Sequence, residues 1–198
     1  CTGGNYLRVD HANTSGSRTI APRNFPGGVL VVNAHLGVLQ GTTLRLDAGL
    51  VVKPVTPTAV VVDGTLIAAG TSTSPVVFTS FQDDTAGGDT NGDGNATSGA
   101  VAQWYGVHFG ATAAASSLTH CEVRFTGYAY WPAIDLVDAN VLLDACRLSD
   151  GSSGGVRLSS AARPTIRGCS FARFSGAPAA HGISIDALSA FHANTATD

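Results

Sequence analysis

The chain has 198 residues and a formal net charge of −3, so it is long enough to bury a substantial core and lacks the basic surface that binds nucleic acid. Hydrophobic residues make up 44%, charged residues only 13%, and Gly occurs 24 times, a composition that favours short strands and tight turns over long helices. No run of about 18 apolar residues is present, which excludes a transmembrane helix.

The first 27 residues are rich in Asn, Ser, Thr and Gly and lack the strand pattern that follows them. We expect residues 1–27 to form a tether and an N-terminal cap that covers the open edge of the first strands. The opening Cys1-Thr2-Gly3-Gly4-Asn5 resembles the start of a mature bacterial lipoprotein, in which such a Cys carries the lipid. An arbitrary start of the sequence is the alternative. A lipid on Cys1 would anchor the protein to a membrane without crossing it.

Short apolar units follow from Gly28 onward. They include Leu44-Arg45-Leu46, Val60-Val61-Val62 and Pro75-Val76-Val77-Phe78, and each is long enough for one short strand. The units recur roughly every 16 to 18 residues, which is typical of the stacked coils of a solenoid.

A long polar insertion at residues 82–103 carries the most specific chemical signal of the chain. Asp89, Asn91 and Asp93, followed by a Gly, match the first half of an EF-hand-type calcium loop, in which alternating oxygens converge on the ion. The motif is incomplete, because Ala100 stands where the last ligand would be. The alternative is a solvated acidic turn without metal. The candidate ligands of a structural Ca²⁺ ion are Asp83, Asp84, Asp89, Asn91, Asp93 and Asn95.

Two repeated units occupy the second half of the chain. The first is Gly106-Val107-His108-Phe109, which recurs as Ala133-Ile134-Asp135-Leu136, Gly155-Val156-Arg157-Leu158 and Gly182-Ile183-Ser184-Ile185. The second places an apolar residue three positions before a Cys and another two positions after it, at Cys121, Cys146 and Cys169. If each unit lies one coil above the last, these cysteines form a buried structural ladder with a spacing of about 4.8 Å. Inward stacking does not require a disulfide between neighbours, and whether one forms stays open.

These repeats predict an all-β fold, a right-handed parallel β-helix of about seven or eight coils over residues 28–198, with the insertion at 82–103. An antiparallel sandwich is the alternative, but it would not explain the constant register of the cysteines. Val62-Asp63-Gly64-Thr65-Leu66 and Trp104-Tyr105-Gly106-Val107-His108-Phe109 resemble bacterial parallel β-helix repeat proteins of the pectin-lyase-like group. The resemblance implies the fold but no single activity, because the group includes lyases, hydrolases and adhesins.

The outward positions of the repeated strands form a polar row, His108, Asp135, Arg157 and Ser184. Adjacent coils would bring these side chains within about 5 Å of each other, close enough for Asp135 to pair with Arg157 and to contact His108. In polysaccharide lyases of the group this face binds the sugar chain. An enzyme would use His108 as the base, Arg157 to stabilise developing charge and Asp135 to orient His108. The alternative is a solvated face whose polar side chains pair across coils for stability.

An aromatic cluster precedes two of these strands. Exposed aromatic rings stack on sugar rings or fill pockets of a protein partner, whereas the alternative is that they only cover the side of the solenoid. The candidate ligand-binding residues are Trp104, Tyr105, Tyr128, Tyr130 and Trp131.

The predicted function is a non-enzymatic extracellular or cell-surface module of a bacterium, in which a rigid solenoid binds a glycan, a neighbouring protein or a second copy of itself. The alternative is a carbohydrate-active enzyme, either a polysaccharide lyase or a glycoside hydrolase, that uses the outward face of the repeated strands. A groove at this face would favour the enzyme, and a flat sheet would favour the binding module. Membrane contact is expected only through a lipid on Cys1.

Overall fold

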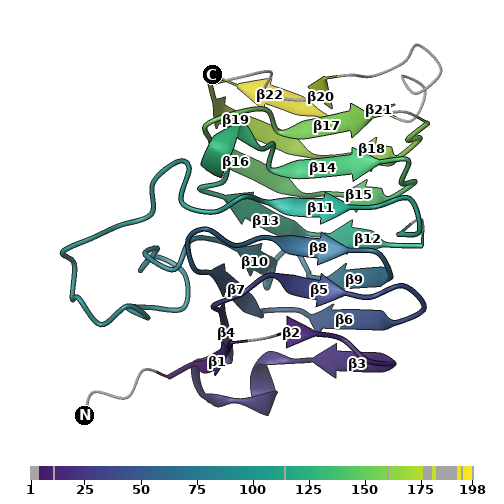
Figure 1. Ribbon diagram of the computed structural model, residues 1–198. Coiled ribbons are helices and arrows are strands. Elements are labelled where there is room, and N and C mark those ends of the chain that lie inside the picture. The colour runs from purple at the N-terminus through teal and green to yellow at the C-terminus, as the bar shows by residue number, and fades with distance from the viewer. Residues whose placement is uncertain are drawn as a thin grey trace.

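The computed structural model describes residues 5–10, 12–113, 115–159, 161–175, 180–181, 191–192 and 194–197. In this part of the chain, all strands pair in parallel and stack as a β-helix of about seven coils (Figure 1). Each coil supplies one strand to each of three sheets, and the strands of a sheet stack in chain order. The all-β, parallel solenoid that the repeats predict is therefore confirmed.

The described strands divide among three sheets. Sheet 1 contains β1 (Leu7–Val9), β4 (Val29–Val32), β7 (Val51–Pro54), β10 (Val76–Phe78), β13 (Cys121–Arg124), β16 (Arg147–Gly151), β19 (Ser170–Phe174) and β22 (Thr195–Thr197). Sheet 2 contains β2 (Ala12–Asn13), β5 (Leu36–Val38), β8 (Val60–Val62), β11 (Val107–Phe109), β14 (Ile134–Val137), β17 (Val156–Ser159) and β20 (Ala180–His181). Sheet 3 contains β3 (Ser17–Ile20), β6 (Thr43–Asp47), β9 (Thr65–Ala69), β12 (Ser117–Thr119), β15 (Leu142–Asp144), β18 (Thr165–Arg167) and β21 (Phe191–His192).

Among the residues that the structure describes, helical structure is limited to short 3₁₀ turns, namely η1 (Pro22–Asn24), η2 (Pro26–Gly28) and η3 (Tyr128–Tyr130). Within the described ranges, no helix is long and apolar enough to cross a membrane.

The solenoid begins earlier than the strand pattern predicts. β1, β2 and β3 pair with β4, β5 and β6, so a first coil stands within residues 1–27, where a tether and cap are expected. This coil is hard to recognise in the sequence because β1 and β3 are largely exposed and supply few apolar residues to the core. Cys1, the candidate lipid site, lies outside the described residues.

The early coils are also longer than the expected roughly 16 to 18 residues. Thr43 pairs with Thr65, which lies 22 positions later, and Leu36 pairs with Val60, which lies 24 positions later. The apolar units underestimate the period because each coil holds three strands and three corners, and not every strand has a conspicuous apolar run.

Columns of apolar side chains that run along the stack form the core. A column in sheet 1 consists of Leu30, Val52, Phe78, Val123, Leu148 and Phe171. Each of these side chains is at most 1% exposed. Full burial of an apolar side chain of this size contributes about 1.5 to 3 kcal/mol, so a shift in the register of one coil would lose several such contributions.

The three cysteines form one such column. Glu122 pairs with Arg147, and Arg147 with Ser170, so the preceding Cys121, Cys146 and Cys169 share one register. All three thiols are free, and each residue is 1% exposed. Hydrogen bonding between the stacked thiols, together with burial, raises the pKa of Cys146 and of Cys169. The three buried thiols therefore act as small apolar groups.

A single left-handed residue precedes each Cys and explains the spacing of the motif. His120, Ala145 and Gly168 have φ angles of 47°, 53° and 60°. Along a straight strand every second side chain points inward, so residues three apart would face opposite sides. The left-handed corner turns the chain, and both Leu118 and Cys121 are buried in the core.

The burial of the cysteine column predicts its reactivity. In a Cys1→Ser variant, which removes the only other Cys of the chain, we expect no thiol to react with Ellman's reagent at pH 8 while the protein is folded, since each thiol is buried in the core. All three should react at once in denaturant. Rapid labelling of any thiol in the folded protein would contradict the inward ladder.

Candidate functional site

The outer face of sheet 2 brings three of the candidate catalytic residues together. β11, β14 and β17 place His108 opposite Asp135 and Asp135 opposite Arg157, in the row expected from the repeated strands. The next coil differs from the expectation, because His181 and not Ser184 pairs with Arg157. The apolar pattern of the fourth unit suggested a register three residues too late, and Ser184 itself lies outside the described residues.

Asp135 is the centre of this row, and its side chain is only 2% exposed. Arg157 donates to both carboxylate oxygens, from Nε at 2.8 Å and from Nη2 at 2.7 Å. His108 Nδ1 lies 3.0 Å from Asp135 Oδ2. Burial alone would raise the pKa of Asp135, but the hydrogen bonds from His108 and Arg157 and the charge of Arg157 outweigh it and hold this pKa below the usual value.

These contacts fix the protonation pattern of the His108 ring. A carboxylate only accepts hydrogen bonds, so the Nδ1 atom that faces Asp135 carries a proton. In the neutral ring, Nε2 is then left as a hydrogen-bond acceptor. The Nε2 atom of His108 therefore makes no contact within the row.

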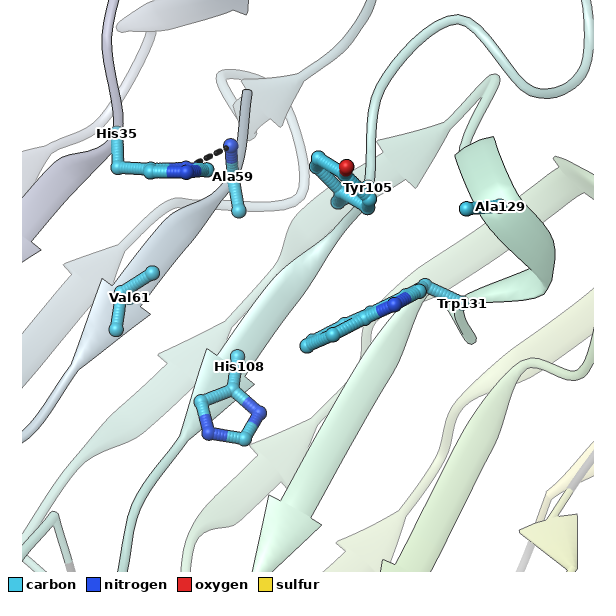
Figure 2. Close-up of a pocket in the computed structure, with 7 residues that line it drawn as sticks. All are labelled: His35, Ala59, Val61, Tyr105, His108, Ala129 and Trp131. Atoms are coloured by element: carbon cyan, nitrogen blue, oxygen red, sulfur yellow. Dashed lines mark hydrogen bonds between the residues drawn. The ribbon is translucent and has the colours of Figure 1, made fainter. Parts of the chain in front are cut away.

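A pocket of about 390 Å³ opens beside His108 (Figure 2). This volume lies within the range of roughly 300 to 1,000 Å³ that is usual for small-molecule sites. Figure 2 shows His35 and Trp131 on opposite sides of the pocket. The lining residues are His35, Ala59, Val61, Tyr105, His108, Ala129 and Trp131.

Trp131 and Tyr105 form an aromatic wall in this pocket. Their ring centroids are 5.5 Å apart with the planes at 67°. Trp131 also packs against the His108 ring at 5.6 Å, and the Arg157 guanidinium carbon lies 5.8 Å from the centroid of the Trp131 ring. Because three neighbours hold the indole in place, a ligand that stacks on Trp131 would pay little entropy to order it.

Gly106 allows the chain to pass from the aromatic wall into β11. Its φ of 126° lies in the region that favours glycine, and a Cβ atom here would lie 2.5 Å from the carbonyl oxygen of Pro132. The backbone N–H of Tyr105 donates to the carbonyl of Thr58 at 3.0 Å, which fixes Tyr105 on the preceding coil.

His35 is the functional candidate that the sequence did not reveal. Its Nδ1 accepts a hydrogen bond from the backbone N–H of Ala59 at 2.9 Å, so Nδ1 carries no proton. The ring is therefore neutral, with its proton on Nε2. His35 and His108 have no informative spacing in the chain, and only the stacking of β5, β8 and β11 brings them to one pocket.

The candidate aromatic residues separate into different environments. Tyr105 and Trp131 line the pocket, and Tyr128 packs against Tyr105 with ring centroids 5.1 Å apart at 80°. Tyr130 is 83% exposed and does not line the pocket. Tyr130 is therefore an aromatic control for the pocket residues.

Trp104 belongs to the core, and its expected role in ligand binding is wrong. The residue is 0% exposed, and its indole N–H donates to the carbonyl of Arg124 at 2.8 Å. Trp104 also forms a parallel bridge with Thr126, which draws it into the stack. Its sequence neighbour Tyr105 points the other way, as alternating positions of an extended chain do.

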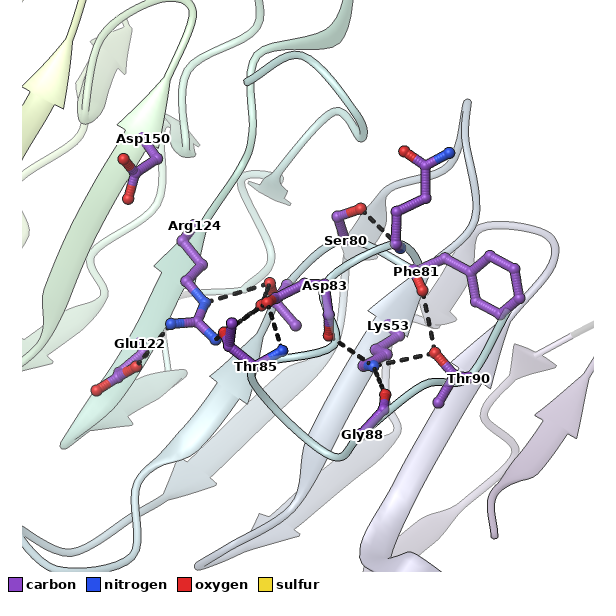
Figure 3. A network of polar contacts seen from close by, with 12 residues as sticks. Lys53, Ser80, Phe81, Asp83, Thr85, Gly88, Thr90, Glu122, Arg124 and Asp150 are labelled. Carbon is purple, nitrogen blue, oxygen red and sulfur yellow. Dashed lines mark hydrogen bonds and ion pairs between the residues drawn. The ribbon is translucent and has the colours of Figure 1, made fainter. Parts of the chain in front are cut away.

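A buried lysine holds the insertion against sheet 1 (Figure 3). Lys53, in β7, is 0% exposed, and its Nζ donates to the carbonyls of Asp83 and Gly88, each at 2.8 Å, and to the hydroxyl of Thr90 at 3.0 Å. Burial lowers the pKa of Lys53 to about 8, although the charges of Asp83 and Asp84 oppose the shift. The three acceptors compensate the buried ammonium group.

Asp83, an expected calcium ligand, belongs to this anchor. Its side chain is 1% exposed, and its Oδ2 lies 2.7 Å from Arg124 Nη2. The hydroxyls of Thr79 and Thr85 also donate to the carboxylate. The charge of Asp83 is thus paired with Arg124, and its carboxylate is not among those that converge in the loop, so the sequence assignment of Asp83 needs correction.

Three other acidic residues of the insertion converge. Asp84, Asp89 and Asp93 each bring one carboxylate oxygen within 4.8 Å of the other two. One side-chain oxygen each of Asp84, Asn91 and Asp93 is buried without a hydrogen-bond partner. Burial, followed by the charge of Asp89, raises the pKa of Asp84. Asn95 is exposed.

No protein-family model matches this chain, and no similar protein was found among the curated proteins or the solved structures. The geometry of the pocket and of the insertion therefore carries the functional argument.

The burial of Asp135 predicts an effect on stability that an exposed pair lacks. Asp144 pairs with Arg167 across coils through a single contact of 2.7 Å, and the two side chains are 27% and 49% exposed. We expect Asp135→Asn to lower the free energy of unfolding by about 2 kcal/mol, because it leaves Arg157 without a counter-charge at a partly exposed site. Asp144→Asn should cause little or no loss. Chemical denaturation measures both variants, and equal losses would contradict the account.

The same pair predicts a dependence on pH. Because the folded-state pKa of Asp135 lies below the usual 3.8, its stabilising contribution is complete above that value. The contribution is lost as the pH falls through the folded-state pKa. The stability difference between the wild type and Asp135→Asn should therefore shrink below pH 3.8.

Proposed function

We propose that the protein is a non-enzymatic binding module whose pocket beside His108 takes a sugar ring of a glycan. The observation that carries this proposal is the aromatic wall of Tyr105 and Trp131 facing two imidazole rings in one pocket. The apolar face of a sugar ring stacks on an aromatic side chain, while its hydroxyls need hydrogen-bond partners beside the ring. His35 and His108 supply such partners.

The contacts of the polar row favour binding over catalysis. A lyase needs a cation that faces the charge developing on its substrate, but the charge of Arg157 is already paired with the Asp135 carboxylate. A glycoside hydrolase needs two carboxyl groups at one cleft, but Asp135 is buried and no Asp or Glu lines the described pocket. A polysaccharide lyase or glycoside hydrolase at this face is therefore the less favoured candidate.

The expected location and partners of the protein are compatible with this proposal but do not test it. A parallel β-helix holds a binding pocket on a rigid stack, which suits an extracellular or cell-surface module in contact with glycans or a surface protein. Membership of the pectin-lyase-like group, bacterial origin, self-association and a lipid on Cys1 stay predictions.

The sugar site is tested by the signals of the two indole groups of the chain. In a titration with methyl β-D-glucopyranoside, methyl β-D-galactopyranoside and methyl α-D-mannopyranoside, at least one sugar should shift the ¹H–¹⁵N signal of Trp131. The signal of the buried Trp104 should stay in place and serves as an internal reference. Measured by titration calorimetry with the same sugar, Trp131→Ala should abolish binding, whereas Tyr130→Ala, at an exposed ring outside the pocket, should retain it. Binding that survives Trp131→Ala would rule out this pocket.

We also propose that Asp84, Asp89, Asn91 and Asp93 hold a structural Ca²⁺ ion in the insertion. The converging carboxylate oxygens and the buried oxygens without partners support this proposal. Carboxylate and amide oxygens are the ligands that Ca²⁺ prefers, and a cation would relieve the repulsion among the three carboxylates. The ion would order the loop, which Lys53 and Arg124 already attach to sheet 1 at its base.

Calcium binding is tested by titration calorimetry and by thermal unfolding with and without Ca²⁺. We expect the wild type to bind Ca²⁺ and to unfold at a higher temperature in its presence. Asp93→Asn removes one ligand charge at nearly constant shape and should weaken binding at least about tenfold. Asp63→Asn, at an exposed position outside the insertion, should bind as the wild type does. Equal binding by both variants would contradict the assignment.

A further inference from the structure

We propose that the pocket selects uncharged pyranose rings over uronates, because its charges and its hydrogen-bonding pattern are already balanced before a ligand enters. This inference rests on the proposed sugar-binding function and names the ligand class of the same site. It would set the protein apart from binders of acidic polysaccharide chains.

The lining of the pocket holds no permanent cation that could receive a carboxylate. Among the described residues that line it, Ala59, Val61 and Ala129 are aliphatic, Tyr105 and Trp131 are aromatic, and the remaining two are His35 and His108. None is Lys or Arg. A carboxylate that left water for this lining would lose its hydration without gaining a cation.

Arg157 is the cation that contacts the aromatic wall, but it is already paired. Its bidentate contact with Asp135 uses Nε and Nη2, and its guanidinium carbon lies 5.8 Å from the centroid of the Trp131 ring. Asp135 is buried within the row and is also held by His108, so it cannot swing away to release Arg157. The arginine therefore supports the wall and has its charge cancelled locally.

The two imidazole rings offer one donor and one acceptor. His35 uses Nδ1 to accept from Ala59, which leaves Nε2–H as a donor. His108 uses Nδ1–H to donate to Asp135, which leaves Nε2 as an acceptor. One sugar hydroxyl can accept from the first ring, and another can donate to the second. A carboxylate can only accept, so it would leave the His108 acceptor facing another acceptor.

The experiment uses pairs of sugars that differ only at C6. Methyl β-D-glucopyranoside is compared with methyl β-D-glucuronide, and methyl β-D-galactopyranoside with its uronate, at pH 8 and constant ionic strength. The Trp131 indole signal reports binding and the Trp104 signal is the reference. We expect each uronate to bind at least about tenfold more weakly than its neutral partner, because its carboxylate is desolvated without compensation.

The outcomes separate this inference from the function on which it rests. If no neutral sugar of either pair shifts the Trp131 signal, both the sugar site and the inference fail. If a uronate binds as well as its neutral partner at Trp131, the sugar site stands and the selectivity is overturned.

Two variants test the cause of the selectivity. Asp135→Asn leaves the charge of Arg157 uncancelled and should raise the affinity for the uronates relative to the neutral sugars by about tenfold. His108→Gln replaces the acceptor nitrogen by a side chain that can also donate. It should likewise raise the affinity for the uronates relative to the neutral sugars. If Asp135→Asn does not fold, the affinities of His108→Gln test the cause on their own. Unchanged selectivity in a folded variant would overturn the proposed cause.

Discussion

The structure depends on one constraint, that each residue of a coil stacks on the residue at the same register one coil away. Parallel pairing imposes this constraint through the backbone hydrogen bonds, and the apolar columns make it energetically specific, because a slip of one residue would turn the core side chains outward. Columns such as Leu30, Val52 and Phe78, together with the thiols of Cys121 and Cys146, follow from it directly. The contacts between residues of adjacent coils therefore determine the structure of the solenoid as much as the order of residues along each coil does.

The same register organises the outer face. It places Asp135 between His108 and Arg157, where the charges of Asp135 and Arg157 are paired and Asp135 accepts hydrogen bonds from both neighbours. The longer connections then supply the walls of a pocket, which a flat sheet lacks. Trp131 and Tyr105 come from connections that precede β14 and β11, and together they convert the face beside His108 into a pocket. Function at this site thus depends on a rigid row and on the rings that its connections place over it.

The sequence predicts the fold well because the inward positions are conspicuous, as in the Cys motif and in Gly106-Val107-His108-Phe109. It misses the first coil, whose strands are exposed, and it misplaces Trp104, since burial of one aromatic residue among several depends on the path of the chain. His35 could not be found, because residues far apart in the chain meet only once the coils are stacked. Asp83 was misassigned because its partner Arg124 comes from another coil.

The most direct test of the pocket as a sugar site is a crystal structure of the protein grown with methyl β-D-glucopyranoside. The account predicts one sugar ring stacked on Trp131, with one hydroxyl at Nε2 of His35 and another at Nε2 of His108. The Asp135 and Arg157 pair should be unchanged beneath it. A sugar bound elsewhere, or a structure in which Asp135 and Arg157 are separated to receive it, would contradict the account.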